Sequence, residues 1–349
     1  MGQSPDSDSY NDNEDGIPFF QGNADFGEKY PTTRKWCNAP TKIAHAEDIL
    51  ISVRAPIGAL NYAKEECCIG RGLAAITPNQ DKVSSGFIYW LLKGKHKELN
   101  LQGTGSTFKA ISRKVLEEIK VPDIELKKQT ELAGSLEKVY SVIQLRKQQL
   151  EELDILIKAR FVEMFGTLQN PALEFKRDAL KNLCFKITDG KHGGCKAEEG
   201  TERYFVGARE IYDDEIHYDT APEINVDEFE KDYKRCNVEI GDFLIVNTGA
   251  TIGKSAIAMD ERTTHTLLQK SVALLKIDPE VLNPVFLKWC YRVNTSMYMV
   301  ESASAQPNLL LSKINVTEIY VPDLELQNQF ADFVIQVDKL KFVETIAKF

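Results

Sequence analysis

Short runs of apolar and β-branched residues, separated by Gly, Asp and Asn, recur along the chain and predict strands. The clearest runs are PFFQG (18–22), ILISV (49–53) and GLAAI (72–76), and later YFVG (204–207), FLIVN (243–247) and SVALLKI (271–277). Helices are predicted near 84–97 and 283–299, after the runs of each group. The pattern therefore predicts two globules of mixed α/β (α+β) structure.

A second pattern predicts long helices. Between Lys127 and Phe165 there is no proline and one glycine, Gly134, and a helix of that length would extend about 58 Å. Its apolar stripe, at three-to-four-residue or heptad spacing, is Leu132, Leu136, Val139, Ile143, Leu150, Leu153 and Ile157. A shorter stripe runs from about Gln327 to the chain end, with Phe330, Phe333, Val337, Leu340 and Ala347. We expect the two helices to pair antiparallel; the alternative is that each packs only on its own globule.

Comparison of the chain with itself shows an internal repeat. The segment SRKVLEEIKVPDIELKKQ (112–129) returns as SKINVTEIYVPDLELQNQ (312–329), with Val121 matched by Val321. Upstream, DILISVRAPIG faces DFLIVNTGATIG with one extra residue in the second copy, and FFQG (19–22) faces YFVG (204–207). The leading segment FKITDGKHGG has only MGQSP as its counterpart, so the first copy is expected to be shortened at its N-terminus.

The repeat predicts four parts. They are a first globule, a long spacer helix, a second globule and a shortened C-terminal helix, over residues 1–123, 124–168, 169–323 and 324–349.

Composition is that of a globular protein, with 43% hydrophobic and 27% charged residues over 349 positions. The formal net charge of -9 argues against binding a polyanion through bulk charge. Any contact with nucleic acid would therefore come from local patches.

Cysteine and histidine positions predict neither a metal site nor a cofactor. The seven cysteines form no C-x-x-C pair and the five histidines form no H-E-x-x-H motif, so the cysteines are expected to be reduced thiols in a cytoplasmic protein. No apolar run approaches the roughly 20 residues of a membrane span, and the N-terminus is acidic where a signal peptide is basic.

The motifs of both copies together resemble the specificity (S) subunit of type I restriction–modification systems. In the first copy these motifs are GIPFFQG, EDILISV, GTGSTFKAIS and IKVPDIELKKQ; in the second they are GDFLIVNTGATIG, ASAQPNLLLS and IYVPDLELQNQ. The resemblance implies a non-catalytic subunit with two target-recognition domains, each reading one half of a bipartite site in double-stranded DNA. It also implies that the helices set the spacing and dock methyltransferase (M) subunits, with restriction (R) subunits as further partners.

Candidate DNA contacts are polar or basic residues in predicted turns or at positions matched by the repeat. They are Arg54, Arg71, Lys109, Arg113, Lys191, His192, Arg209, Thr248, Lys254 and Lys313. Arg209 could make a bidentate contact to guanine. For each basic residue a plain surface charge is the alternative, and for His192 the alternative is a solvated turn.

Three competing functions each fit some feature of the sequence. FLIVNTGATIGKSA ends like a phosphate-binding loop, but Thr248 stands where the pattern needs its first glycine. Asn283-Pro284-Val285-Phe286 approaches an adenine-methyltransferase motif but lacks the second proline, and it equally fits a helix cap. The third is a coiled-coil adaptor whose duplicated globules bind protein; steep salt dependence would distinguish a DNA reader from it.

Overall fold

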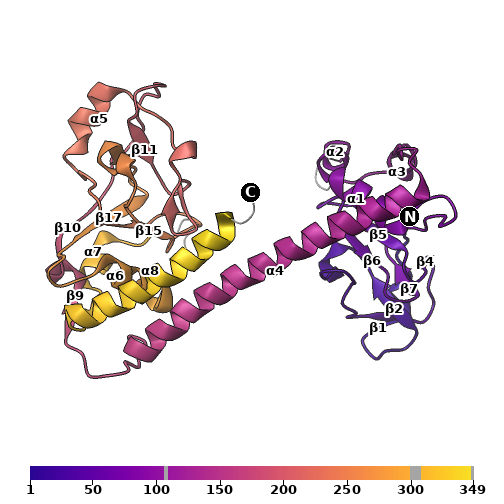
Figure 1. Cartoon of the computed structure of the whole chain (residues 1–349), viewed down its shortest axis with the longest axis horizontal. Helices are drawn as coiled ribbons and strands as arrows, with labels where there is room; N and C mark the ends of the chain where they lie inside the picture. Colours follow the sequence, from indigo (N-terminus) through magenta and orange to yellow (C-terminus); the bar gives the residue numbers. More distant parts are fainter. Residues whose placement is uncertain (106–108, 299–307, 347–349) are drawn as a thin grey trace. The chain divides into compact units, whose positions relative to one another are not determined.

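A computed structural model describes residues 1–105, 109–298 and 308–346 of the chain. Parts of the motifs GTGSTFKAIS and ASAQPNLLLS lie outside the described residues, as does Ala347. The chain divides into two compact units, Met1–Leu145 and Arg146–Phe349, and each is described by itself (Figure 1). The four-part division with separate helical segments remains a prediction.

Unit 1 contains two small sheets whose short strands follow the apolar runs. The first sheet has the order β1 (Tyr10–Asn11), β3 (Trp36–Cys37), β2 (Ile17–Phe20), β7 (Cys67–Ile69) and β4 (Ile43–Ala44). The second has the order β6 (Leu60–Tyr62), β5 (Ile49–Ser52) and β8 (Leu73–Ile76). Only the pair β2–β7 is parallel among the described ladders of this unit.

The helices of unit 1 cover the second sheet. They are α1 (Ser85–Gly94), α2 (His96–Leu101), α3 (Arg113–Glu117) and the start of α4 (Leu126–Phe165), with short 3-10 turns η1 (Ser7–Ser9) and η2 (Asn23–Asp25). Ile49 and Ile51 of β5, Phe87 and Leu92 of α1, and Ala133 of α4 share one buried cluster. One core cluster of this unit therefore lies between β5 and the helices, and a second, with Phe20, Leu50 and Ile69, joins strands of the two sheets.

Unit 2 repeats this plan with longer strands. Its main antiparallel sheet has the order β10 (Cys184–Asp189), β17 (Val272–Ile277), β14 (Phe243–Val246) and β15 (Ser255–Ile257). The unit also has three separate two-stranded pairs. The pair β11 (Tyr204–Val206) with β16 (Thr266–Leu268) is parallel. The other two are antiparallel: β12 (Ile211–Tyr212) with β13 (Glu215–Ile216), and β18 (Glu318–Tyr320) with β9 (Arg177–Ala179). Its helices are α5 (Val226–Tyr233), α6 (Pro284–Val293), α7 (Leu311–Val316) and α8 (Leu324–Ile346), with 3-10 turns η3 (Leu180–Asn182), η4 (Tyr218–Thr220), η5 (Glu261–His265) and η6 (Thr295–Met297).

Within unit 2 the last part of α4 and α8 lie side by side and antiparallel (Figure 1). The Phe161 ring lies 5.2 Å from the Phe330 ring near the start of α8. Earlier in α4, Asp154 accepts a hydrogen bond of 2.8 Å from Lys341, which lies late in α8. Because the residue numbers run in opposite directions along the two helices, the predicted antiparallel pairing is confirmed.

The pairing covers less of the predicted stripe than expected. Ile157, Phe161 and Phe165 are fully buried with Phe330 and Val337 in the main core of unit 2. Leu150, Leu153 and Phe333 are half-buried, and Leu340 is 55% exposed.

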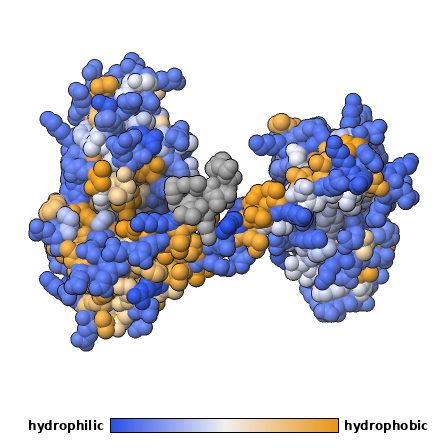
Figure 2. Space-filling model, in the orientation of Figure 1, coloured by the Kyte–Doolittle hydropathy of each residue, from blue (hydrophilic) through white to orange (hydrophobic). Residues whose placement is uncertain are grey.

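The first four predicted stripe residues are exposed instead of buried. Leu132, Leu136, Val139 and Ile143 are 39%, 45%, 58% and 42% exposed. All four lie in the part of α4 that belongs to unit 1, whereas the α4 residues that contact α8 belong to unit 2. Apolar side chains of α4 consequently appear at the surface in Figure 2.

Equivalent backbone hydrogen bonds show that the two units share one framework. Gly2 N–H donates to the Leu73 carbonyl in unit 1 (2.8 Å), and Gly190 N–H donates to the Val272 carbonyl in unit 2 (3.2 Å). The next residue of each segment, Gln3 or Lys191, donates to the last residue of the second parallel strand, Ile69 or Leu268. The predicted match of MGQSP with the segment containing DGKHGG is thereby confirmed.

The same comparison corrects one predicted alignment and supports another. Gly70 N–H donates to Phe20, whereas Gln269 N–H donates to Val206, so Phe20 corresponds to Val206 and not to Phe205. The predicted match of FFQG with YFVG is therefore wrong by one residue. Apolar residues face each other in either alignment, so hydropathy alone does not reveal the shift. The extra residue between β14 and β15 is confirmed, since Gly58→Ser52 and Gly253→Val246 are equivalent N–H to carbonyl bonds.

Candidate nucleic-acid interface

Lys254 lies in the tight turn of an antiparallel hairpin. Strand β14 leads through Ile252 and Gly253 into β15, which begins at Ser255. Gly253 has a φ of 95°, and a Cβ there would lie 2.4 Å from the Tyr298 ring. A phosphate-binding loop needs a helix after its Lys-Ser pair, so the strand at Ser255 excludes that geometry. Lys254 itself is exposed at the end of the turn.

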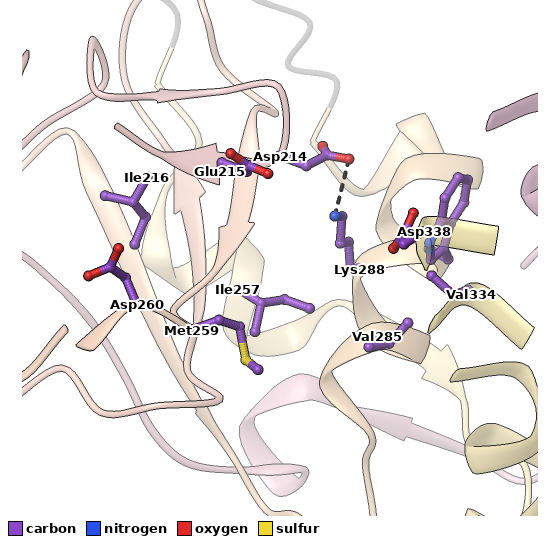
Figure 3. A pocket seen from close by; sticks show the side chains of 11 residues that line it. Asp214, Glu215, Ile216, Ile257, Met259, Asp260, Val285, Lys288, Val334 and Asp338 are labelled. Carbon is purple, nitrogen blue, oxygen red and sulfur yellow. Dashed lines mark ion pairs between the residues drawn. The ribbon is translucent and has the colours of Figure 1, made fainter. Parts of the chain in front are cut away.

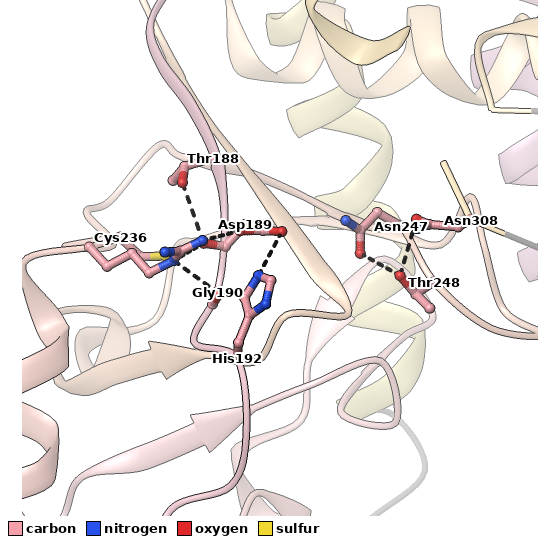
Figure 4. A network of polar contacts seen from close by, with 9 residues as sticks. Thr188, Asp189, Gly190, His192, Cys236, Asn247, Thr248 and Asn308 are labelled. Atoms are coloured by element: carbon pink, nitrogen blue, oxygen red, sulfur yellow. Dashed lines mark hydrogen bonds and ion pairs between the residues drawn. The ribbon is translucent and has the colours of Figure 1, made fainter. Parts of the chain in front are cut away.

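The segment after β10 is fixed by a polar network around Asp189 (Figure 4). Arg235 pairs with the Asp189 carboxylate at 2.5 Å and also donates to the carbonyls of Asp189 and Gly190, each at 3.1 Å. His192 is exposed, with its Nε2 3.5 Å from the same carboxylate, and Figure 4 shows its ring directed toward Asp189. The network positions the His192 ring at the surface, where it can approach a ligand.

Lys191 is already engaged by acidic side chains. Its Nζ lies 2.6 Å from Asp232 and 3.6 Å from Glu228, both on α5. The hydrogen bond that Lys191 donates to the Asp232 carboxylate raises the pKa of Lys191. The charge of this candidate is therefore largely compensated within the unit.

A small group of amide and hydroxyl side chains lies beside the Asp189 network. Thr248 Oγ1 donates toward Oδ1 of Asn247 and Oδ1 of Asn308, each at 3.3 Å, and the three residues lie together in Figure 4. A cavity of about 300 Å³ opens here, lined also by Asp189 and Lys270. Amides and hydroxyls of this kind can bond base edges or phosphate oxygens.

Arg54 is the unit 1 counterpart of Thr248. Arg54 forms an antiparallel bridge with Ala110, and Thr248 forms one with Asn308. Lys109, next to this bridge, is exposed and its carbonyl accepts from Ala55 N–H at 3.0 Å.

The remaining candidates are spread over both units. Arg71 is exposed after β7, Arg209 is exposed in the turn after β11, and Lys313 is exposed on α7. Arg113 donates to Glu117 at 2.7 Å along α3, so its charge is partly offset. The structure thus brings two groups of candidates together. Arg54 and Lys109 lie beside one bridge in unit 1, and Thr248 lies beside the Asp189 network in unit 2.

A larger cavity of unit 2 does not suit an anion. It has a volume of about 400 Å³ and lies between the β12–β13 hairpin, α6 and α8 (Figure 3). Asp214, Glu215, Asp260 and Asp338 line it, with Lys288 held 3.2 Å from Asp214. The excess of carboxylates would repel phosphate groups.

Neither a group of metal-ligating side chains nor a membrane-spanning helix is found in the described residues. In residues 1–105, 109–298 and 308–346, His, Cys, Asp and Glu side chains form no group of three or more that could hold a metal ion. No helix in those ranges combines the length and apolar character needed to span a membrane.

Asn283 and Pro284 form an ordinary helix start. The Asn283 side chain accepts from the N–H groups of Val285 (2.8 Å) and Phe286 (3.4 Å), and Pro284 occupies the first turn of α6. The cap interpretation of this segment is confirmed.

Sequence reasoning missed Lys270, which the framework aligns with Arg71. Both residues stand two positions after the end of a parallel strand, β7 or β16. A signal was available, because GLAAI (72–76) faces SVALL (271–275) and the preceding residues are Arg71 and Lys270.

The fold and the equivalent backbone hydrogen bonds define a class of protein: a duplicated α/β module whose copies are joined through a long helix. A sequence model of the "Type I restriction modification DNA specificity domain" matches residues 1–154 and 185–348. The chain belongs to this family.

Known members of the family match different lengths of the chain. The putative type I restriction enzyme MjaX specificity subunit of Methanocaldococcus jannaschii is 43% identical over 154 residues, 44% of this chain and 36% of that protein. The type I restriction enzyme EcoBI specificity subunit of Escherichia coli is 21% identical over 327 residues, 84% of this chain and 67% of that protein. The match to the MjaX subunit thus spans well under two thirds of that protein's length.

A solved structure agrees with the overall fold. The crystal structure of the type I restriction–modification system S subunit from M. genitalium aligns with a TM-score of 0.55 at 16% identity, over 99% of this chain and 88% of that chain. The agreement supports the mixed α/β fold with two similar units and long helices.

Proposed function

We propose that the chain is a sequence-specific DNA-recognition subunit of a type I restriction–modification complex. Each unit reads one half of a bipartite site, the helices fix the distance between the halves, and catalysis belongs to methyltransferase and restriction subunits. The observation that carries the proposal is the family match over both copies of the repeat, together with the shared backbone framework.

Two similar readers suit DNA because each can meet a half-site of the same kind. When protein readers are joined by a rigid spacer, the separation of half-sites follows from geometry, near multiples of the ~34 Å helical turn. The gap between the halves then carries no contact with bases. The predicted target is therefore two short sequences separated by a fixed number of unread base pairs.

Local rather than overall charge would provide the electrostatic attraction. The chain carries a net charge of -9, and carboxylates already engage Lys191 and Arg113. Arg71 and Lys254, in contrast, are exposed on turns of the shared framework. Affinity would come largely from the partner subunits, and the orientation of the two units from these few cations.

Protein docking fits the exposed part of α4. Leu136, Val139 and Ile143 lie on one face of the helix and remain at the surface. This face is where we place the methyltransferase subunits.

The test is salt-dependent binding by the complex with its methyltransferase partner. Binding to a selected duplex should weaken steeply between about 0.05 and 0.2 M salt, because released counterions compete with the phosphate contacts. The adaptor alternative predicts binding of a protein ligand by the globules, with weak dependence on salt. A complex that shows no salt-sensitive preference for any duplex is not a DNA-recognition complex, and the proposal would then fail.

A further inference from the structure

Each unit has an exposed cation in the turn that follows a parallel strand. In unit 1 the turn is Gly70-Arg71-Gly72 after β7, and in unit 2 it is Gln269-Lys270-Ser271 after β16. In the part of the chain that the structure describes, neither Arg71 nor Lys270 forms an ion pair. Arg262 and Lys276, in contrast, form ion pairs with carboxylates.

The two turns have the same backbone geometry. Leu73 N–H donates to Gly70 at 3.0 Å, and Val272 N–H donates to Gln269 at 2.9 Å, which closes a four-residue turn around each cation. A glycine of the leading segment packs against each turn: a Cβ on Gly2 would lie 2.2 Å from the Gly70 carbonyl oxygen, and one on Gly190 would lie 2.4 Å from the Gln269 carbonyl oxygen. The side chains of Arg71 and Lys270 therefore leave the framework at equivalent points.

A glutamine accompanies each cation, but the two units supply it from opposite strands. In unit 1 Gln21 follows the first parallel strand, and its amide would collide at 2.5 Å with a Cβ on Gly70. In unit 2 the residues are exchanged: Gln269 follows the second strand and would collide at 2.4 Å with a Cβ on Gly207. Each unit thus places one amide over one glycine beside its cation.

This exchange is informative because the residues differ while the arrangement is the same. Gln21 is fixed by hydrogen bonds of 2.8 and 3.1 Å with Ser4, so its amide is oriented at the surface. The uncompensated cation supplies a charged donor, and the amide beside it supplies neutral donors. Together they can bind a single anionic oxygen group.

We propose that Arg71 and Lys270 are the paired phosphate-contact residues of the two units, each binding a DNA phosphodiester with Gln21 or Gln269 alongside. The inference rests on the proposed function. The contact positions each unit on its half-site and carries no base preference, because phosphates are the same at every sequence.

The experiment uses the full chain in complex with its methyltransferase partner and the duplex that the wild-type complex selects. We measure affinity over a series of salt concentrations for Arg71→Gln, Lys270→Gln and the double variant. Loss of one phosphate contact lowers the slope of log affinity against log salt by about 0.9, and the double variant by about 1.8. The preferred base sequence is expected to stay the same.

Matched controls remove an exposed lysine elsewhere in the framework. Lys64 lies before the start of β7, at the other end of the strand from Arg71, and Lys181 lies in η3 before β10, at the other end of that strand from Gly190. Lys64→Gln and Lys181→Gln should keep the wild-type slope. The charge-conserving variants Arg71→Lys and Lys270→Arg should also keep it, which separates loss of charge from local unfolding.

The possible results are distinct. If the wild-type complex is salt-sensitive but Arg71→Gln and Lys270→Gln match the controls, the phosphate assignment is overturned while the proposed function stands. A variant that changes the preferred bases of one half-site contradicts the assignment as well, because it shows base readout. If the wild-type complex itself has no salt-sensitive duplex preference, the proposed function fails and the inference with it.

Discussion

Gly253 is a residue whose identity is fixed by its backbone and its neighbour together. Its φ of 95° favours glycine, and the Tyr298 ring occupies the space of a side chain. We expect Gly253→Ala to lower the free energy of unfolding by at least about 2 kcal/mol, measured by urea denaturation.

Gly249 in the same hairpin provides the control. Its φ is 100°, but nothing lies within 4 Å of a Cβ there. Gly249→Ala should therefore cost only the conformational part, about 1 kcal/mol. Equal losses in the two variants would show that Tyr298 does not restrict the turn.

Asp260 is expected to contribute a pH-dependent part of the stability of unit 2. The two hydrogen bonds that Arg262 donates to it, at 2.8 and 2.7 Å, lower the pKa of Asp260 from its ordinary 3.8. Because the pKa of Asp260 is lowered in the folded state, its contribution to the free energy of unfolding is present above pH 3.8. That contribution is lost as the pH falls through the lowered pKa of the folded protein. Asp260→Asn should remove this acid-dependent loss of stability. The loss is at most about 1 kcal/mol because the ion pair is partly exposed, and it is measured by comparing urea midpoints between about pH 6 and 3. Identical pH profiles of the two proteins would contradict this origin.

Single residues were the least predictable part of the site. The sequence makes Lys191 and His192 candidates because they lie in a glycine-rich segment, but each is engaged by a carboxylate, one near in the chain and one far. Asp189 is three residues from His192, whereas Asp232 is 41 residues from Lys191 and comes close only through the packing of α5. The exchange of Gln and Gly between strands has no signature in sequence, since it exists only between residues brought together by the fold.

At the scale of elements, Phe161 holds α4 against α8 and the globule. Its ring lies 5.2 Å from Phe330, 5.7 Å from Phe286 and 5.0 Å from Phe165, and the side chain is fully buried. Phe161→Ala should lower the free energy of unfolding by about 3–5 kcal/mol through lost burial and the cavity left behind.

The neighbouring Val162 serves as the control for Phe161. It is 39% exposed on the same helix, so Val162→Ala should cost less than about 1 kcal/mol in the same denaturation experiment. A small loss in Phe161→Ala would mean that the helix pairing contributes little to the stability of the unit.

The exposed stripe of α4 is expected to bind the methyltransferase subunit. In the double variant Leu136→Asp with Val139→Asp, two charges replace apolar contacts on one face, and co-purification with the partner should be lost. Both side chains are already exposed, so the far-UV circular dichroism and the unfolding midpoint should stay close to wild type.

A variant on another face of the helix tests whether position matters. Ser141 and Leu145 are exposed and lie about 140–180° around the helix from Leu136, at roughly 100° per residue. Ser141→Asp with Leu145→Asp adds the same charge and should retain the partner. Loss of docking in both double variants, or in neither, would be inconsistent with a stripe-specific interface.

The elements themselves were largely predictable, and their contacts only in part. Continuous helix was predicted from Lys127 to Phe165 because no proline interrupts it, and α4 spans Leu126–Phe165. The stripe was ended too early at Ile157, although Phe161 and Phe165 continue it at four-residue spacing and form the centre of the packing. Which part of α4 is buried could not be read from its own pattern, because burial depends on the residues that pack against it, such as Phe330 and Val337 against Phe161.

At the scale of the whole molecule, duplication was the most reliable signal. A repeat that keeps its order over both copies predicts two similar folds, and the backbone hydrogen bonds of Gly2 and Gly190 are equivalent. The one-residue error at FFQG arose because hydropathy is alike on both alignments, while hydrogen bonding is not. DNA contacts of the candidate residues stay predictions, since surface position alone does not distinguish a phosphate contact from a solvated charge.

The central claim is that two equivalent units read two halves of one DNA site. Its most direct test is the sequence that the complex with its methyltransferase partner enriches from a pool of randomised duplexes. We predict two short conserved segments separated by a gap of fixed length and random sequence. Enrichment of one continuous segment, or of no sequence at all, would contradict the account.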